Sequence, residues 1–181
     1  MVATPKDLAQ VAAQNWLRQG ESMHRIFERR PGFLASTVAG SAKVPHVPVN
    51  PVPKCAQSVS EDYLKPSGLV ARGGHVGDEW VHDRGIRGWA TAADGHQLAV
   101  QVADVLAAGN GYAWLITTTQ RIAVVIPARF VEQPAAPLVT WWERPPNAVR
   151  GIRDVLLGRA FFGAPFASID FADGSTLLLR Q

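Results

Sequence analysis

The segment WLITTTQRIAVVI, residues 114–126, constrains the fold more than any other stretch of the chain. Its thirteen residues are too few for a membrane-spanning helix, which needs roughly 20 apolar residues. Tryptophan and β-branched residues favour a strand, and the polar TTTQR run at the centre favours a turn. We therefore predict a β-hairpin that pairs residues 112–118 with residues 121–126 and ends at Pro127.

Both arms of this hairpin are apolar on both faces, because successive residues of a strand point to opposite sides of a sheet. In the first arm, Trp114 and Ile116 share one face, and Leu115 lies on the other. A sheet with one face in water would instead alternate apolar and polar residues. Each face therefore needs a cover, and the predicted helices over residues 5–19 and 94–108 can supply it.

Further strand patterns follow the hairpin. PLVTWWER, residues 137–144, predicts a strand that ends before two prolines. FASIDF and STLLLR predict two more strands, which the Asp-Gly pair of ADGS joins through a two-residue primed turn. Residues 21–33 and 148–158 fit either a strand or a helix. We predict an α+β fold, with a strongly bent antiparallel sheet, two flanking helices and a proline-rich arm.

The chain divides into three regions that we expect to form one compact unit. Residues 1–40 are an N-terminal helix and arm, residues 41–57 a polyproline linker, and residues 58–181 the α+β domain. Prolines recur every third residue in the linker, which matches the repeat of a polyproline II helix. The segment fits a ligand for a proline-binding groove, or a stiff linker that lies along its own domain. The second interpretation is favoured.

The glycine-rich stretch 67–88 is expected to be a long loop, and it holds the candidate metal or catalytic residues. These candidates are His75, Asp78, Glu79 and His82. Imidazole and carboxylate groups bind metals and transfer protons, but the spacing departs from the H-E-x-x-H pattern. We therefore predict no catalytic residue, no bound metal and no cofactor. A metal-dependent enzyme that uses the loop from His75 to Asp83 is the alternative.

Charge and composition narrow the functional classes. The 18 Lys and Arg residues exceed the 15 Asp and Glu residues by only 3, which disfavours nucleic acid as a partner. The single cysteine, Cys55, excludes an internal disulfide. The N-terminal residues lack the apolar core of a signal peptide, and no apolar run is long enough to span a membrane. We expect a cytoplasmic protein.

Three motifs within residues 112–181 carry a resemblance. WLITTTQRIAVV has a threonine–x–x–arginine turn, formed by Thr118 and Arg121. WWERPPNAVRGI leads from a strand through a proline corner to an arginine-glycine step, and IDFADGSTLLL contains a late hairpin. These motifs resemble bacterial pleckstrin-homology-like and GRAM-like domains, and NWLRQGE near the N-terminus is similar to their glycine-glutamate entry.

The resemblance implies a half-barrel made from a strongly bent antiparallel sheet. It also implies binding of lipid head groups, peptides or protein partners, without catalysis. Pleckstrin-homology folds close one end of the sheet with a C-terminal helix, whereas the last predicted element here is a strand. One of the two predicted helices would have to take that place.

Arginines recur at the corner that follows the WWER strand. The candidate binding surface consists of Arg144, Arg150, Arg153 and Arg159. Connections between strands lie on the surface, and arginine suits bidentate contact with carboxylate or phosphate. We predict a non-enzymatic interaction module or scaffold that binds a protein partner or an anionic lipid head group. Arginine-mediated binding of nucleic acid or another anionic surface is the remaining alternative.

Overall fold

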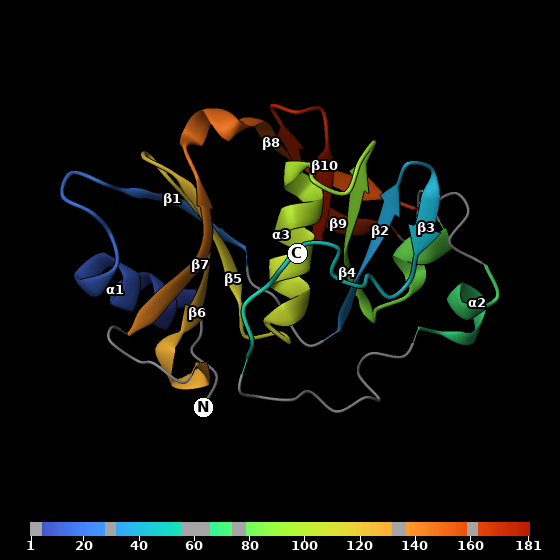
Figure 1. Ribbon diagram of the computed structural model, residues 1–181, viewed down its shortest axis with the longest axis horizontal. Helices are drawn as coiled ribbons and strands as arrows, with labels where there is room; N and C mark the ends of the chain where they lie inside the picture. The colour runs from blue at the N-terminus through green and yellow to red at the C-terminus, as the bar shows by residue number, and fades with distance from the viewer. Residues whose placement is uncertain (1–4, 28–31, 56–65, 74–78, 132–136, 159–162) are drawn as a thin grey trace.

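The strands of the protein form two sheets (Figure 1). The computed structural model describes residues 5–27, 32–55, 66–73, 79–131, 137–158 and 163–181. Sheet A contains, in spatial order, β1 (Met23–Phe27), β5 (Trp114–Thr118), β6 (Ile122–Pro127) and β7 (Leu138–Arg144). Sheet B contains β3 (Ser41–Lys43), β2 (Phe33–Val38), β4 (Ile86–Ala92), β10 (Thr176–Arg180), β9 (Ala164–Phe171) and β8 (Val149–Leu157). The α+β class is confirmed, although the strands are divided between two sheets where the sequence predicted one bent sheet.

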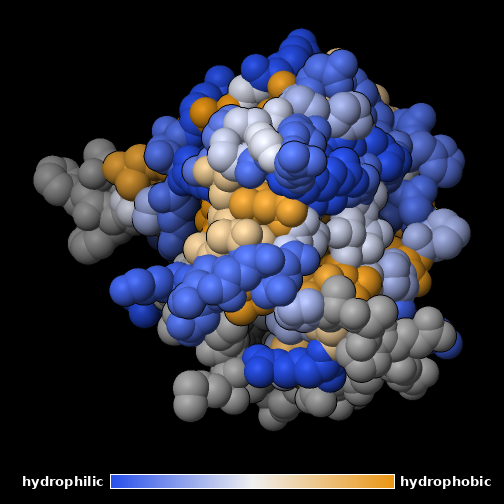
Figure 2. Space-filling view, turned by 90° about the vertical axis from the view of Figure 1, so that its left-hand side faces the viewer, coloured by the Kyte–Doolittle hydropathy of each residue, from blue (hydrophilic) through white to orange (hydrophobic). Residues whose placement is uncertain are grey.

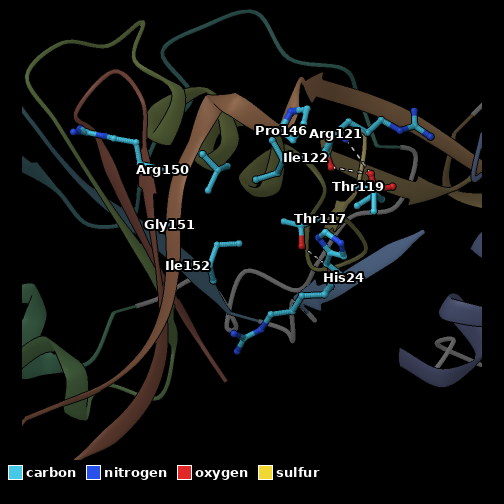
Figure 3. A pocket seen from close by; sticks show the side chains of 12 residues that line it. His24, Thr117, Thr119, Arg121, Ile122, Pro146, Arg150, Gly151 and Ile152 are labelled. Atoms are coloured by element: carbon cyan, nitrogen blue, oxygen red, sulfur yellow. Dashed lines mark hydrogen bonds between the residues drawn. The ribbon is translucent and has the colours of Figure 1, made fainter. Parts of the chain in front are cut away.

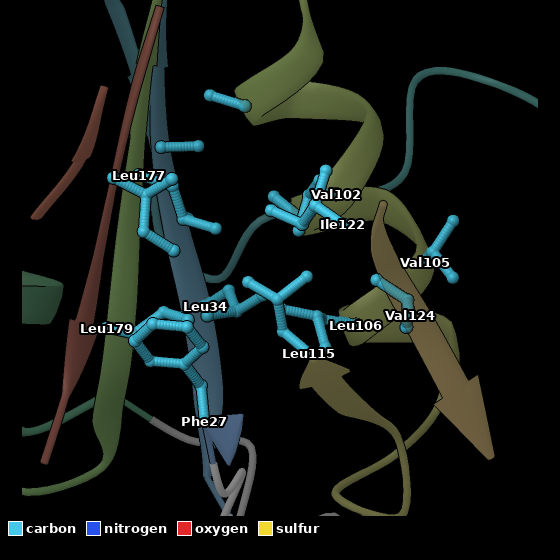
Figure 4. Packing of buried hydrophobic residues seen from close by; sticks show 14 of the residues in the cluster. Phe27, Leu34, Val102, Val105, Leu106, Leu115, Ile122, Val124, Leu177 and Leu179 are labelled. Carbon is cyan, nitrogen blue, oxygen red and sulfur yellow. The ribbon is translucent and has the colours of Figure 1, made fainter. Parts of the chain in front are cut away.

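Helix α3 (Leu98–Ala108) lies between the two sheets (Figure 1). Val102 of this helix belongs to one buried cluster with Leu115 and Val124 of sheet A and Leu34 and Leu177 of sheet B (Figure 4). The helix is apolar on more than one face because both sheets cover it. Full burial of each such aliphatic side chain stabilises the fold by about 1.5–3 kcal/mol.

Helix α1 (Pro5–Asn15) covers the other face of sheet A. Its Leu8 and Ala12 share a buried cluster with Trp114 and Ile116 of β5. The β5–β6 hairpin is therefore enclosed on both faces by the two predicted helices, as its apolar pattern required. The helix ends at Asn15, four residues earlier than the prediction over residues 5–19.

The outer face of sheet B is covered in part by residues 68–71 and 79–82, which lie between β3 and β4 in the chain. Helix α2 (Gly68–Ala71) and the 3₁₀ helix η2 (Glu79–His82) are short, in agreement with the predicted loop. Trp80 of η2 lies 4.8 Å from the ring of Trp89 and 5.2 Å from that of Phe166, measured between centroids. These aromatic contacts attach the loop to the sheet.

Strands β2 and β4 run parallel, which the sequence did not predict. The other strand pairs of the described residues are antiparallel. A parallel pair needs a long connection, and here residues 39–85 supply it. The described parts of the two ambiguous segments contain strands and no helix of the α type: residues 21–33 include β1 and the start of β2, and residues 148–158 include β8.

The predicted start of α3 at Asp94 is wrong, because the helix begins at Leu98. The Asp94 carboxylate accepts a hydrogen bond from the His96 backbone N–H at 2.6 Å and so closes a local turn. The helix is capped from elsewhere: the Leu98 N–H donates to the Asp173 carboxylate at 2.6 Å, and the Ala99 N–H to the Ser175 hydroxyl at 3.0 Å. The turn between β9 and β10 therefore caps the helix, which no local pattern indicates.

That turn also differs from the primed two-residue type. Gly174 has a positive φ of 87°, as predicted, but Asp173 does not have a positive φ. The Gly174 N–H donates to the Phe171 carbonyl at 3.1 Å, and the Phe171 N–H donates to the Ser175 carbonyl at 2.9 Å. These bonds define a three-residue loop with glycine in the left-handed position. The hairpin itself is confirmed.

Candidate functional site

A cleft of about 420 Å³ opens between the two sheets (Figure 3). Strand β1 and the β5–β6 hairpin form the side that belongs to sheet A. The 3₁₀ helix η4 (Pro146–Ala148) and the first residues of β8 form the other side. The cleft lies where the edge strand of sheet A and the edge strand of sheet B approach each other.

The lining of the cleft is cationic at its rim and apolar inside. The basic or titratable nitrogen side chains are His24, Arg25, Arg121 and Arg150. Ile122, Val149 and Ile152 supply the apolar surface, and residues 117–119 supply three hydroxyl groups. Among the described residues, no carboxylate lines the cleft. A pocket with this composition fits a group that is negatively charged or accepts hydrogen bonds and is attached to an apolar body.

Figure 3 shows how these side chains are arranged. Ile122, Ile152 and Thr117 border the open centre, with His24 beside Thr117. The side chains of Arg121 and Arg150 extend away from that centre on opposite sides. Of these two arginines, Arg150 is exposed at the rim of the cleft, whereas Arg121 is buried.

Arg121 is held in a buried ion network and is a structural residue. Its Nε donates to Glu21 Oε1 at 2.9 Å, its Nη1 to Glu143 Oε2 at 2.7 Å, and its Nη2 to the Trp16 carbonyl at 3.1 Å. The guanidinium also lies 4.0 Å from the centroid of the Trp16 ring. Two carboxylates already neutralise this arginine, so it fixes the hairpin against the end of α1.

The same network determines the direction in which the pKa of Glu21 is shifted. Burial alone would raise this pKa, but hydrogen bonds from Arg121, from the Arg18 backbone N–H and from the Thr118 hydroxyl lower it below its ordinary value. The predicted threonine–x–x–arginine turn therefore has a defined function in the fold. Thr118 and Arg121 both contact Glu21, the glutamate of the NWLRQGE motif.

Arg25 and Asp154 link the two sheets beside the cleft. Arg25 belongs to β1 and Asp154 to β8, and their Nη2 and Oδ1 atoms are 2.6 Å apart. The Asp154 carboxylate also accepts a hydrogen bond from Gln181 Nε2 at 2.5 Å. Arg25, and to a smaller degree Gln181, hold the pKa of Asp154 below its ordinary value. Asp154 is exposed and Arg25 is half-buried, so an external anion can compete with Asp154 for Arg25.

Of the three predicted surface arginines that the structure describes, only one lines the cleft. Arg150 lines it, and its Nε donates to the Phe171 carbonyl at 3.0 Å. Arg144 donates to Gln101 Oε1 at 2.8 Å and stacks on Trp142, while Arg153 lies 3.3 Å from the Asp170 carboxylate. Arg159 lies outside the described residues. Sequence reasoning missed His24 and Arg25, which come from a strand more than 100 residues earlier.

A second polar network lies under the proline-rich segment. His46 Nε2 and Asp104 Oδ1 are 2.6 Å apart, and His46 Nδ1 and Ser36 Oγ are 2.8 Å apart. The Asp104 carboxylate also accepts hydrogen bonds from the backbone N–H of Val49 and from the backbone and side chain of Asn50. The segment is thus attached to α3, as expected for a linker that lies along its own domain.

The hydrogen-bonded chain of Ser36, His46 and Asp104 contains the residue types of a hydrolytic triad, but all three residues are buried. Ser36 and Asp104 have no exposed surface, so no substrate reaches the hydroxyl. Burial would raise the pKa of Asp104, but the hydrogen bonds from His46, Asn50 and Val49 lower it. A sequence signal was present, since Asp104 is the one charged residue within the apolar helix α3.

The predicted metal candidates fall partly outside the structure. His75 and Asp78 are not among the described residues. Glu79 and His82 belong to η2 and are exposed. The Asp83 carboxylate accepts hydrogen bonds from the backbone N–H of Ser67 and Gly85 at 2.8 Å each, which makes it a turn residue. In the part of the chain that the structure describes, no group of three or more His, Cys, Asp or Glu residues could hold a metal ion.

The surface next to α1 is mainly hydrophilic, with a smaller apolar area near its centre (Figure 2). No described helix is long and apolar enough to cross a membrane. Comparisons with protein-family models, with curated proteins and with solved structures found no match.

Proposed function

We propose that this protein is a non-enzymatic binding module whose inter-sheet cleft receives an acidic group of a protein partner. The observation that carries the proposal is the lining of the cleft, which combines a cationic rim with an apolar interior and contains no carboxylate among the described residues. Arginine at such a rim provides charge-assisted hydrogen bonds to carboxylates, and the apolar interior provides contact area.

The buried networks support binding in preference to catalysis. The Ser36–His46–Asp104 group is closed to substrate, and Arg121 is neutralised by Glu21 and Glu143. Both networks fix elements around the cleft or across α3, and neither presents a reactive group to solvent. A rigid frame with a polar, cationic opening is typical of a recognition surface.

As part of the same proposal, we infer that the chain is related to bacterial pleckstrin-homology-like and GRAM-like domains. The two mostly antiparallel sheets and the helices that pack on them support an α+β class only at a coarse level, and the Thr118–Arg121 turn motif that carries the resemblance borders the cleft. Domains of this type bind proteins or anionic head groups without catalysis. A cytoplasmic location would suit such an interaction module.

The proposal is tested with oligo-L-glutamate as the acidic probe and oligo-L-lysine as its opposite. We expect the wild-type protein to bind oligo-L-glutamate with an affinity that falls as salt is added. The Arg150→Glu variant should bind about tenfold more weakly, which corresponds to about 1.4 kcal/mol. Lys43→Glu is the matched control, because Lys43 is exposed in β3 at the opposite edge of sheet B from β8.

Equal affinity of the wild type and Arg150→Glu for oligo-L-glutamate would contradict the proposal, as would equal loss in Lys43→Glu. Vesicles that contain phosphatidylserine test the anionic head group in a parallel titration. If the protein binds these vesicles and does not bind oligo-L-glutamate, the cleft is a binding site for a lipid head group, and the proposed protein partner is rejected.

A further inference from the structure

We propose that the partner's acidic group is part of an extended segment that adds to sheet B as a strand along β8. This inference rests on the proposed function of the cleft and specifies the form of its occupant. Three observations carry it: the unpaired edge of β8, the alternating side chains along that strand, and the ion pair between Arg25 and Asp154.

β8 is the last strand of sheet B, with β9 as its only partner among the described strands. It is nine residues long, which is longer than most strands. An edge strand presents unpaired backbone N–H and C=O groups that can pair with another chain. Proteins commonly recognise extended peptides in this way, with backbone bonds for affinity and alternate side chains for specificity.

The side chains on the cleft side of β8 favour a ligand in which acidic and apolar residues alternate. Ile152, Asp154 and Leu156 lie opposite Ile169, Ala167 and Pro165 of β9, so they share one face of the sheet. Ile152 packs against the buried cluster around α3, and Leu156 is 67 % exposed. An apolar side chain of an added strand could cover Leu156 and remove that surface from water.

Charge complementarity identifies the added segment as acidic. Arg25 reaches from β1 across the cleft to β8, where Asp154 holds it at 2.6 Å. Asp154 thereby occupies the position that a ligand carboxylate would take. Arg150 stands at the start of the same strand, with only the Phe171 carbonyl as its hydrogen-bond partner among the described residues. A strand with acidic residues can therefore contact both arginines by displacing one exposed internal carboxylate.

The probe is an acetylated and amidated peptide of roughly six alternating glutamate and valine residues, the length of an ordinary strand. Its first control has the same sequence with alternate backbone nitrogens methylated, which removes donors from one edge and keeps the charge. Its second control replaces glutamate with lysine. Binding is measured by titration calorimetry with the wild type, Asp154→Asn, Arg150→Glu and Lys43→Glu.

We expect the parent peptide to bind at least about tenfold more tightly than the methylated peptide. Asp154→Asn should bind the parent peptide several-fold more tightly than the wild type does, because the internal competitor for Arg25 is removed. A gain of affinity cannot come from a misfolded variant. Hydrogen exchange of backbone amides in residues 149–157 should slow when the parent peptide is bound.

Equal affinity for the parent and methylated peptides would overturn strand addition. If binding still depended on Arg150 in the same titration, the proposed binding of acidic groups in the cleft would stand. Loss of affinity in Asp154→Asn would overturn the role of Asp154 as an internal competitor. Binding of phosphatidylserine vesicles without binding of any peptide would reject both the added strand and the protein partner.

Discussion

Asp104 is the residue on which the attachment of the proline-rich segment depends. It is fully buried in α3 and accepts hydrogen bonds from His46, Asn50 and the backbone of Val49. A buried carboxylate is costly unless donors surround it, and here they do. This explains why a charged residue persists in a helix that is otherwise apolar.

Replacing Asp104 with alanine should therefore lower the free energy of unfolding by about 3–5 kcal/mol, because its buried donors lose their acceptor. Urea denaturation followed by circular dichroism measures this loss. Asp94→Ala is the control, since Asp94 is exposed and accepts one local hydrogen bond, and it should cost about 1 kcal/mol or less. A loss below about 1 kcal/mol in Asp104→Ala would show that the network does not stabilise the fold.

Single residues also mark the limit of prediction from the sequence. The pairing of His46 with Asp104 joins positions 58 residues apart, and that of Arg25 with Asp154 joins positions 129 apart. Local patterns carry no information on such partners, since the three-dimensional arrangement of elements brings them together. The sequence pattern identified a segment rich in arginine, but among the three candidates that the structure describes only Arg150 lines the cleft.

At the scale of elements, the β5–β6 hairpin was the most predictable part of the fold. Its β-branched arms, its polar turn and its two apolar faces all favour the same structure, and the covering helices follow from those faces. The N-terminus of α3 was not predictable, because the cap comes from Asp173 in the β9–β10 turn. The parallel pairing of β2 with β4 was also missed, since the proline-rich connection indicates no direction.

At the scale of the whole molecule, several carboxylates connect elements that are distant in the chain. The pKa values of four carboxylates lie below their ordinary ones. In each case burial would raise the pKa, and hydrogen bonds to the carboxylate outweigh that effect in Glu21, Asp104, Glu143 and Asp173. A lowered pKa in the folded state stabilises that state at pH values above the ordinary pKa of the unfolded chain. The stabilisation is lost as pH falls through the folded pKa.

We therefore expect the free energy of unfolding to decrease steeply below about pH 4, near the ordinary pKa of Asp and Glu. Urea denaturation at pH 7 and at lower pH values measures the decrease. In Glu21→Gln the decrease should be smaller, since one of the lowered groups no longer titrates. Constant stability from pH 7 down to about pH 3 would contradict the assignment of these carboxylates as stabilising groups.

The cationic cleft lies where β1, an edge strand of sheet A, approaches β8, an edge strand of sheet B. The most direct test of its role is a map of backbone amide chemical shifts recorded by NMR while oligo-L-glutamate is added. We predict that the largest changes fall on residues 24–25, 117–119 and 149–152, and that oligo-L-lysine does not cause them. Changes confined to the outer face of sheet B or to the proline-rich segment, with these residues unaffected, would contradict the assignment of the cleft as the binding site.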